Sequence, residues 1–132
     1  MADNFLKAWA RKFFKGRPSF QLNGASFGYE DGSTVTQATD KTTAFTLNTV
    51  TGRIIFAASA LAAFTSSSAT WTNSFMGSYD VVAFVQNSGS FKYNFHVVCS
   101  DGQGSIVIYN ASNGSLTEAV AVSFVLIKGS WS

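Results

Sequence analysis

Apolar and polar residues alternate along much of the chain, and residues 119–127 form a nearly continuous apolar run that is rich in β-branched side chains. Successive side chains of a β-strand point to opposite faces, so Val120, Val122, Phe124 and Leu126 share one face. The other face carries smaller side chains and is not polar either. This pattern predicts a strand at the centre of a sheet that is covered by a second layer. The smaller face is expected to meet a second sheet or neighbouring subunits, and its candidate interface residues are Ala119, Ala121, Ser123 and Val125.

A second long strand is predicted at Phe91–Cys99. Its odd positions are aromatic, aliphatic or cysteine, whereas its even positions include Lys92, Asn94 and His96. This period of two is typical of a half-buried strand. We expect it to pair directly with residues 119–127.

Shorter apolar segments, separated by polar or glycine-containing breaks, predict six further strands. Their number and spacing favour a mainly β fold, an antiparallel β-sandwich of the jelly-roll-like kind. Ala57–Phe64 is open to a second interpretation as a helical turn, because alanine favours helix. The six strands are expected at Thr34–Ala38, Thr43–Leu47, Arg53–Ala57, Thr70–Phe75, Val81–Gln86 and Ser105–Tyr109.

The N-terminus follows the period of a helix instead. Residues 4–15 predict a short amphipathic helix in which apolar side chains recur every four positions and basic side chains occupy the remaining arc. A helix of about twelve residues is marginal in water, so we expect it to form against a partner. Burying each large apolar side chain contributes about 1.5–3 kcal/mol, more than the about 1 kcal/mol for a basic residue near an anionic surface. The expected docking residues are Phe5, Leu6, Lys7, Trp9, Arg11, Lys12, Phe13 and Lys15.

Charge divides the chain in the same place. Residues 1–17 carry five basic side chains and one acidic one, a net +4, whereas the remaining residues carry four basic and six acidic ones, a net −2. We therefore divide the chain into a basic arm (1–17), a glycine-containing connector (18–33) and a β-sandwich domain (34–132). Only 12% of all residues are charged, a composition that suits permanent contact with neighbouring proteins.

Candidate chemistry is sparse. His96 is the only histidine and Cys99 the only cysteine, which excludes a histidine metal cluster, a Ser-His-Asp triad and a disulfide within one chain. Cys99 is expected to act as a small hydrophobe. Residues 101–104 predict a hairpin turn and lack the helix that a dinucleotide-binding loop requires. The acidic residues flank predicted turns and form no obvious pair of catalytic carboxylates: Glu30, Asp31, Asp40, Asp80, Asp101 and Glu118.

These observations predict a protein that is not an enzyme. We expect no catalytic, cofactor-binding or metal-binding residues and no cofactor. The first seventeen residues lack the pattern of a signal peptide, and no run of about 18 apolar residues predicts a membrane span. Synthesis in a cytoplasm without stable membrane insertion is therefore the expectation.

Three stretches share a recognisable pattern of turn and strand-start residues. The first runs from Gly32 to Asn48 and continues at Thr51-Gly52-Arg53-Ile54. The second is Trp71-Thr72-Asn73-Ser74, followed by Asp80-Val81-Val82. The third is Gly114-Ser115-Leu116-Thr117-Glu118-Ala119, leading into Phe124–Lys128. Together they cover about residues 32–128, and the pattern resembles a β-sandwich module found in structural proteins of tailed bacteriophages.

The resemblance implies a trimeric, non-enzymatic virion component that is made in the host cytoplasm. We expect a capsid decoration, cement or short fibre protein, anchored by its arm to other virion proteins of the capsid or tail. A membrane surface, packaged nucleic acid or the chain's own domain are alternative partners of the arm. Five basic residues give only weak, salt-sensitive binding to nucleic acid, which is therefore not expected to be the main partner.

An alternative function is a host-surface module of a tail fibre or spike that binds carbohydrate. In this interpretation an exposed aromatic side chain stacks on a sugar ring. The candidates are Trp71, Tyr79 and Tyr109.

Overall fold

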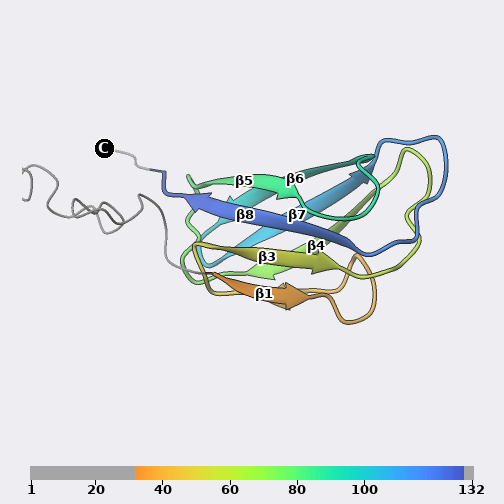
Figure 1. Ribbon diagram of the computed structural model, residues 1–132. Helices are drawn as coiled ribbons and strands as arrows, with labels where there is room; N and C mark the ends of the chain where they lie inside the picture. Colours follow the sequence, from red (N-terminus) through yellow and green to blue (C-terminus); the bar gives the residue numbers. More distant parts are fainter. Residues whose placement is uncertain (1–31, 130–132) are drawn as a thin grey trace, which may run out of the picture. The chain divides into compact units, whose positions relative to one another are not determined.

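The computed structural model describes residues 32–129, which form eight β-strands in two four-stranded sheets (Figure 1). We name the sheets after their central strands: the β8 sheet has the order β1-β3-β8-β5, and the β7 sheet has the order β2-β4-β7-β6. The mainly β sandwich expected from the sequence is thus present, and no helix occurs among these residues. The strands are β1 (Ser33–Thr36), β2 (Phe45–Thr46), β3 (Thr51–Phe56), β4 (Ser66–Thr72), β5 (Val81–Gln86), β6 (Tyr93–Ser100), β7 (Gln103–Asn110) and β8 (Val120–Ile127).

Both sheets are mixed, so the expectation of a purely antiparallel sandwich is wrong at two strand pairs. β1 runs parallel to β3, and β2 runs parallel to β4. The reason lies in the connections. The chain passes from the β8 sheet to the β7 sheet and back with each of the first four strands, so every second strand returns to the same sheet in the same direction.

β8 lies inside its sheet, as its two apolar faces predict, but its partner was predicted wrongly. It pairs antiparallel with β3 and β5, whereas β6 pairs with β7 in the opposite sheet. The inner faces of β6 and β8 therefore both line the core, from opposite sheets. Two strands with apolar faces can pair side by side or pack face to face, and a period of two does not distinguish these arrangements.

All eight expected strands are present, and β5 has the expected bounds. The largest displacement is in β4, which begins at Ser66 because its serines pair with Val107–Tyr109 of β7. The helical turn considered for Ala57–Phe64 is absent. That segment instead contains an isolated antiparallel bridge between Leu61 and Leu116, which shows that tertiary pairing outweighs the helix propensity of its alanines.

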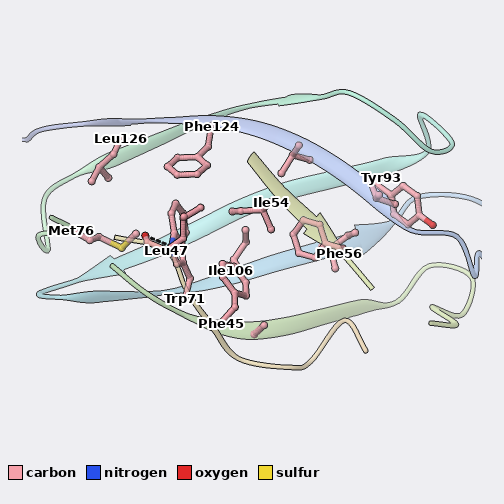
Figure 2. Packing of buried hydrophobic residues seen from close by; sticks show 14 of the residues in the cluster. Phe45, Leu47, Ile54, Phe56, Trp71, Met76, Tyr93, Ile106, Phe124 and Leu126 are labelled. Carbon is pink, nitrogen blue, oxygen red and sulfur yellow. Dashed lines mark hydrogen bonds between the residues drawn. The ribbon is translucent and has the colours of Figure 1, made fainter. Parts of the chain in front are cut away.

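The core lies between the two sheets (Figure 2). Trp71 of β4 is fully buried, and its ring meets Phe124 of β8 edge to face with centroids 4.6 Å apart. Its Nε1–H donates to the Leu47 carbonyl at 3.2 Å, so the polar atom of the indole is satisfied inside the core. The four residues of the predicted inner face of the last strand, Val120, Val122, Phe124 and Leu126, are all buried here, as the sequence predicts.

Strand direction assigns the loops to two ends of the sandwich. β1 begins and β8 ends at one end, together with the loops 73–80 and 101–102 (Figure 1). The opposite end carries the loops 37–44, 57–65, 87–92 and 111–119. The predicted arm and nearly all of the connector lie outside the described residues.

Candidate interaction surface

The outer face of the β8 sheet carries a group of apolar side chains, which we call the β5–β8 patch. The sheet register places Val81 beside Ile127 and Ala83 beside Val125. Val81 is 59% exposed and Val85 is 66% exposed, although both are aliphatic. Contiguous apolar side chains on an outer face mark a contact site more often than scattered ones do. The patch consists of Val81, Ala83, Val85, Val125 and Ile127.

Charge is confined to the margins of this patch. β5 contains no charged residue. Arg53 of β3 lies at one side, where it pairs with Ser123. Lys128 follows β8 at the other side, where its ammonium binds Asp80. A partner surface therefore has to match the patch mainly in shape and apolar character.

The four residues expected at a subunit interface occupy different environments. Ala121 is 1% exposed, because its N–H donates to the Ser88 hydroxyl and the loop after β5 lies close to it. Ser123 donates to the Asn87 side chain at 2.7 Å. Ala119 is exposed just before β8, and Val125 is half-buried within the β5–β8 patch. Of the four, Val125 contributes directly to a continuous apolar surface.

The sequence contained a signal for the rest of this patch. Within Val81–Gln86, the largest side chain is Phe84, and it shares a face with Val82. Both pack against the core cluster. The face opposite a buried phenylalanine must point outward, which identifies Val81, Ala83 and Val85 as solvent-facing despite their apolar character.

The outer face of the β7 sheet is different. The exposed positions of β4 are Ser66, Ser68, Thr70 and Thr72. Across β7 they align with the outward side chains of β6, which include Asn94 and His96. This face is mostly polar and suited to solvent, so the two outer faces of the sandwich are not equivalent.

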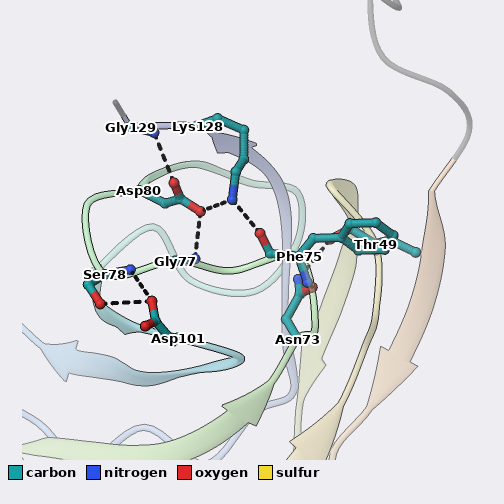
Figure 3. A network of polar contacts seen from close by, with 9 residues as sticks. All are labelled: Thr49, Asn73, Phe75, Gly77, Ser78, Asp80, Asp101, Lys128 and Gly129. Carbon is teal, nitrogen blue, oxygen red and sulfur yellow. Dashed lines mark hydrogen bonds and ion pairs between the residues drawn. The ribbon is translucent and has the colours of Figure 1, made fainter. Parts of the chain in front are cut away.

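A polar network closes the end at which β8 finishes (Figure 3). The Asp80 carboxylate accepts bonds from the Gly77 N–H at 2.7 Å and the Gly129 N–H at 2.9 Å, and it pairs with the Lys128 ammonium. Burial by itself raises the pKa of Asp80, but the bonds from Lys128, Gly129 and Gly77 outweigh it and hold that pKa below its ordinary value of 3.8. This network fastens the end of β8 to the loop before β5.

Asn73 organises the neighbouring turn. It is fully buried, and its amide donates to the Thr49 carbonyl at 2.7 Å while its side-chain oxygen accepts from the Phe75 N–H at 3.0 Å (Figure 3). Its side chain is thus bound to backbone groups of two loops. Its role is structural, since a buried amide is stable only when its polar atoms are paired.

Lys41 holds the opposite end together. Its ammonium is buried and donates to the carbonyls of Ala57 at 2.8 Å, Ser59 at 2.6 Å and Glu118 at 3.0 Å. Burial lowers the pKa of Lys41, and the negative charge of Glu118 partly counteracts this shift. A lysine ammonium has three donors and no acceptor, so the bonds to these three carbonyls use all of its donors.

The candidate reactive residues lie apart from one another. His96 is exposed on the outer face of β6, and Cys99 is half-buried on the inner face. Burial, with Asp80 adding to it, raises the pKa of the Cys99 thiol. Burial and the nearby Glu118 also raise the pKa of Tyr93 to about 12. Both shifts favour the neutral, less nucleophilic form.

Turn chemistry accounts for Asp40 and Asp101, two of the four acidic residues between positions 32 and 129. The Asp40 carboxylate accepts from Thr42 and Thr43, and these bonds hold the pKa of Asp40 below 3.8. Asp101 begins the tight hairpin between β6 and β7, where Gly102 has a φ of +78°, as predicted from the sequence. No three His, Cys, Asp or Glu side chains between residues 32 and 129 come together as a metal site.

The aromatic candidates for sugar stacking differ in accessibility. Trp71 was a wrong candidate, because it lies in the core. Tyr79 is exposed in the loop before β5, and Tyr109 is half-buried on the outer face of β7. Phe64 and Phe91, on loops at the opposite end, are also exposed, and no pattern in the sequence predicted this.

The eight arm residues, from Phe5 to Lys15, lie outside the residues that the structure describes. Within residues 32–129, no helix has the length and hydropathy of a membrane span. No protein-family model, curated protein or solved structure matches this chain.

Proposed function

We propose that this chain is a non-enzymatic structural protein of a bacteriophage virion, a capsid decoration, cement or short fibre protein. The β5–β8 patch carries the proposal, because an apolar outer face opposite a polar one suits a subunit that is covered on one side. The assignment to a bacteriophage rests on the resemblance in turn and strand-start residues across positions 32–128. The proposal also includes two structural features, a jelly-roll-like topology for the sandwich and a helix in the N-terminal arm.

The polar residues of that pattern support a structural role. Lys41, Asn73 and Asp80 bind backbone groups of loops distant in sequence. Their side chains are occupied in holding the two ends of the sandwich. Residues of this kind stabilise the fold. We therefore assign them no role in binding a cofactor, and the proposed function includes none.

The arm is the proposed attachment element. Phe5, Leu6, Trp9 and Phe13 would enter an apolar groove of another capsid or tail protein, with Lys7, Arg11, Lys12 and Lys15 around them. Helix-in-groove docking uses apolar side chains at this spacing. Burying four such side chains at about 1.5–3 kcal/mol each offsets the cost of ordering a short helix. The assembled protein would lie in the virion after synthesis in the host cytoplasm.

Removal of residues 1–17 tests the attachment. The sandwich should keep its thermal unfolding transition, because every contact described above lies within residues 32–129, whereas the truncated chain should no longer enter particles. A sharper pair of variants substitutes Phe5, Trp9 and Phe13 by serine, or Lys7, Lys12 and Lys15 by glutamine. The serine variant should lose incorporation and the glutamine variant should retain it at moderate salt. Normal incorporation of the truncated or serine variant would refute the anchoring role.

The proposal includes the homo-trimer that the resemblance implies. Ala119, Ser123 and Val125 are the members of the expected interface that retain exposed surface. The copy number per particle, measured by quantitative mass spectrometry against the major capsid protein, should be a multiple of three. Any other number argues against the trimer.

A second candidate function is recognition of a host-surface glycan by a fibre or spike. The exposed ring of Tyr79 favours it, because aromatic rings stack on sugar rings. A glycan array should then show specific binding that Tyr79→Ala reduces at least tenfold and Tyr109→Ala leaves less affected. Absence of specific binding by the intact chain would exclude this function.

A further inference from the structure

We propose that a second copy of the chain adds to the open edge of β5, antiparallel to it, so that two β8 sheets become one continuous sheet. This inference goes beyond the proposed function and identifies one self-association site. It concerns a two-fold contact, which can join two free chains or link chains of neighbouring trimers.

The two sides of the sandwich differ in the length of their edge strands. On one side the sheets end in β1 and β2, which have four and two residues. On the other side they end in β5 and β6, which have six and eight residues. Very short edge strands offer few backbone groups to an incoming chain, whereas long ones present a template for pairing. Among residues 32–129, the β5 side is therefore the longer open edge of the β8 sheet.

β5 also lacks the features that normally protect an edge strand. It contains no charged residue and no proline, and among residues 32–129 it pairs with β8 alone. β6 at least carries His96, Asn94 and a terminal serine on its exposed positions. An uncharged edge rich in β-branched residues is the kind that other strands join.

The ladder with β8 identifies which backbone groups of β5 are open. The Asn87 N–H donates to the Ala121 carbonyl at 2.7 Å, and bonded pairs alternate along an antiparallel ladder. Val85, Ala83 and Val81 therefore bond to β8. The N–H and C=O groups of Val82 and Phe84 point to the open edge, where they can bond to a second strand.

One self-pairing register satisfies both the backbone and the side chains. If Ala83 lies opposite Ala83 of the second copy, Val82 lies opposite Phe84 and forms a bonded pair. Val81 then lies opposite Val85 on the outer face. A shift by one residue would place outward side chains opposite inward ones. Small side chains at the two-fold axis with valines on either side give close, unstrained cross-strand contacts.

A second copy fits this edge better than a different partner. In a two-fold contact the same surface patch of both copies meets, so a patch of one charge would face like charge and be repelled. The β5–β8 patch has no charge to repel, and pairing through β5 makes the two patches one continuous apolar surface. Val125 and Ile127 of each copy would extend it on both sides of the axis.

Val85→Lys tests this contact in the intact chain. Val85 is 66% exposed, so a lysine there should not disturb the isolated fold. Across the two-fold axis, however, it would face Val81 of the second copy. Val98→Lys is the matched control, since Val98 is 61% exposed on the outer face of β6. Sedimentation equilibrium should show dimers or hexamers for the parent chain and for V98K, and at least a tenfold weaker dimerisation for V85K.

A cysteine variant tests the register independently. Ala83→Cys would place two thiols opposite each other in a non-bonded pair, where strands are closest, so mild oxidation should give a disulfide-linked dimer. Ser105→Cys, on the outer face of β7, and the parent chain with Cys99 alone are the controls. A parent chain that is only monomeric or only trimeric would overturn the proposal. So would equal effects of V85K and V98K, or no faster cross-linking of A83C than of S105C. Particle incorporation does not enter these measurements, so their failure leaves the proposed virion role untouched.

Discussion

Single polar residues fix the loops of this protein. Lys41, Asn73 and Asp80 are each buried or nearly so, and each binds backbone groups from segments that are distant in sequence. A buried polar group stabilises a fold only when its partners are present, and losing a partner exposes the full desolvation cost. These residues should therefore contribute more to stability than surface residues of the same type.

Lys41→Met should lower the free energy of unfolding by about 2–4 kcal/mol, because it leaves three buried or partly buried carbonyls without their charged donor. Urea denaturation of the two proteins measures the difference. Lys92→Met is the control, since Lys92 is exposed, and it should change stability by less than about 0.5 kcal/mol. A loss below about 1 kcal/mol for K41M would show that solvent reaches these carbonyls.

Asp80 should make stability depend on acidic pH. Because its folded-state pKa lies below its unfolded value of 3.8, the carboxylate adds stability above about pH 4, and this is lost as pH falls through the folded-state pKa. Asp80→Asn should reduce the free energy of unfolding at neutral pH by about 1–3 kcal/mol and flatten its decline in acid.

Thermal unfolding of D80N and the parent chain across the acidic range measures both effects. Asp101→Asn is the matched control, because Asp101 is exposed and, among residues 32–129, its carboxylate accepts bonds from Ser78 alone. Asp40, whose pKa is also lowered, stays in both variants and leaves a residual pH dependence. Parallel pH curves for D80N and the parent chain would contradict the assignment.

At the scale of elements, the strands owe their positions to packing between layers as much as to their own patterns. Gly104 in β7 is an example. A Cβ atom there would lie 2.7 Å from the Met76 sulfur and 2.8 Å from a Val97 methyl group. The absence of a side chain lets the loop after β4 fold over the start of β7.

Gly104→Ala should destabilise the protein by about 1–3 kcal/mol, the usual cost of overpacking a filled site. Gly114→Ala provides the control, because apart from its chain neighbours no heavy atom of residues 32–129 lies within 4 Å of a Cβ at that position, and its effect should stay within about 0.5 kcal/mol. Chemical denaturation of both variants gives the comparison. Equal stabilities would mean that Met76 moves aside without cost.

At the scale of the whole molecule, two sheets share one core. Trp71 comes from one sheet and Phe124 from the other, and their rings are in contact. Neither sheet has an apolar interior of its own, so the sandwich should unfold as a single cooperative unit, as most small domains do.

Phe124→Ala should lower the free energy of unfolding by about 3–5 kcal/mol. The far-ultraviolet signal of the strands and the near-ultraviolet signal of the buried indole should still change together. Phe91→Ala removes an exposed ring and should cost less than about 0.5 kcal/mol. Two separated transitions, one for each probe, would show that the sheets unfold independently.

The sequence by itself determined the class of fold, the number and approximate place of its strands, and the inner face of β8. These follow from local alternation of side chains, which a strand imposes wherever it lies. It also identified the Asp101-Gly102 turn, because a short glycine-containing loop between two strands predicts a hairpin. The expectation that acidic residues serve turns holds for Asp40 and Asp101.

Only the tertiary structure decided which strands are neighbours, which aromatic rings are exposed and which apolar residues face outward. The pairing of β8 with β3 and β5, the burial of Trp71 and the exposure of Val85 depend on contacts between residues far apart in the chain. Alternation with a period of two shows only that a strand has two different faces. Which face meets the core, and which strand lies alongside, is set by how both layers close around one apolar interior.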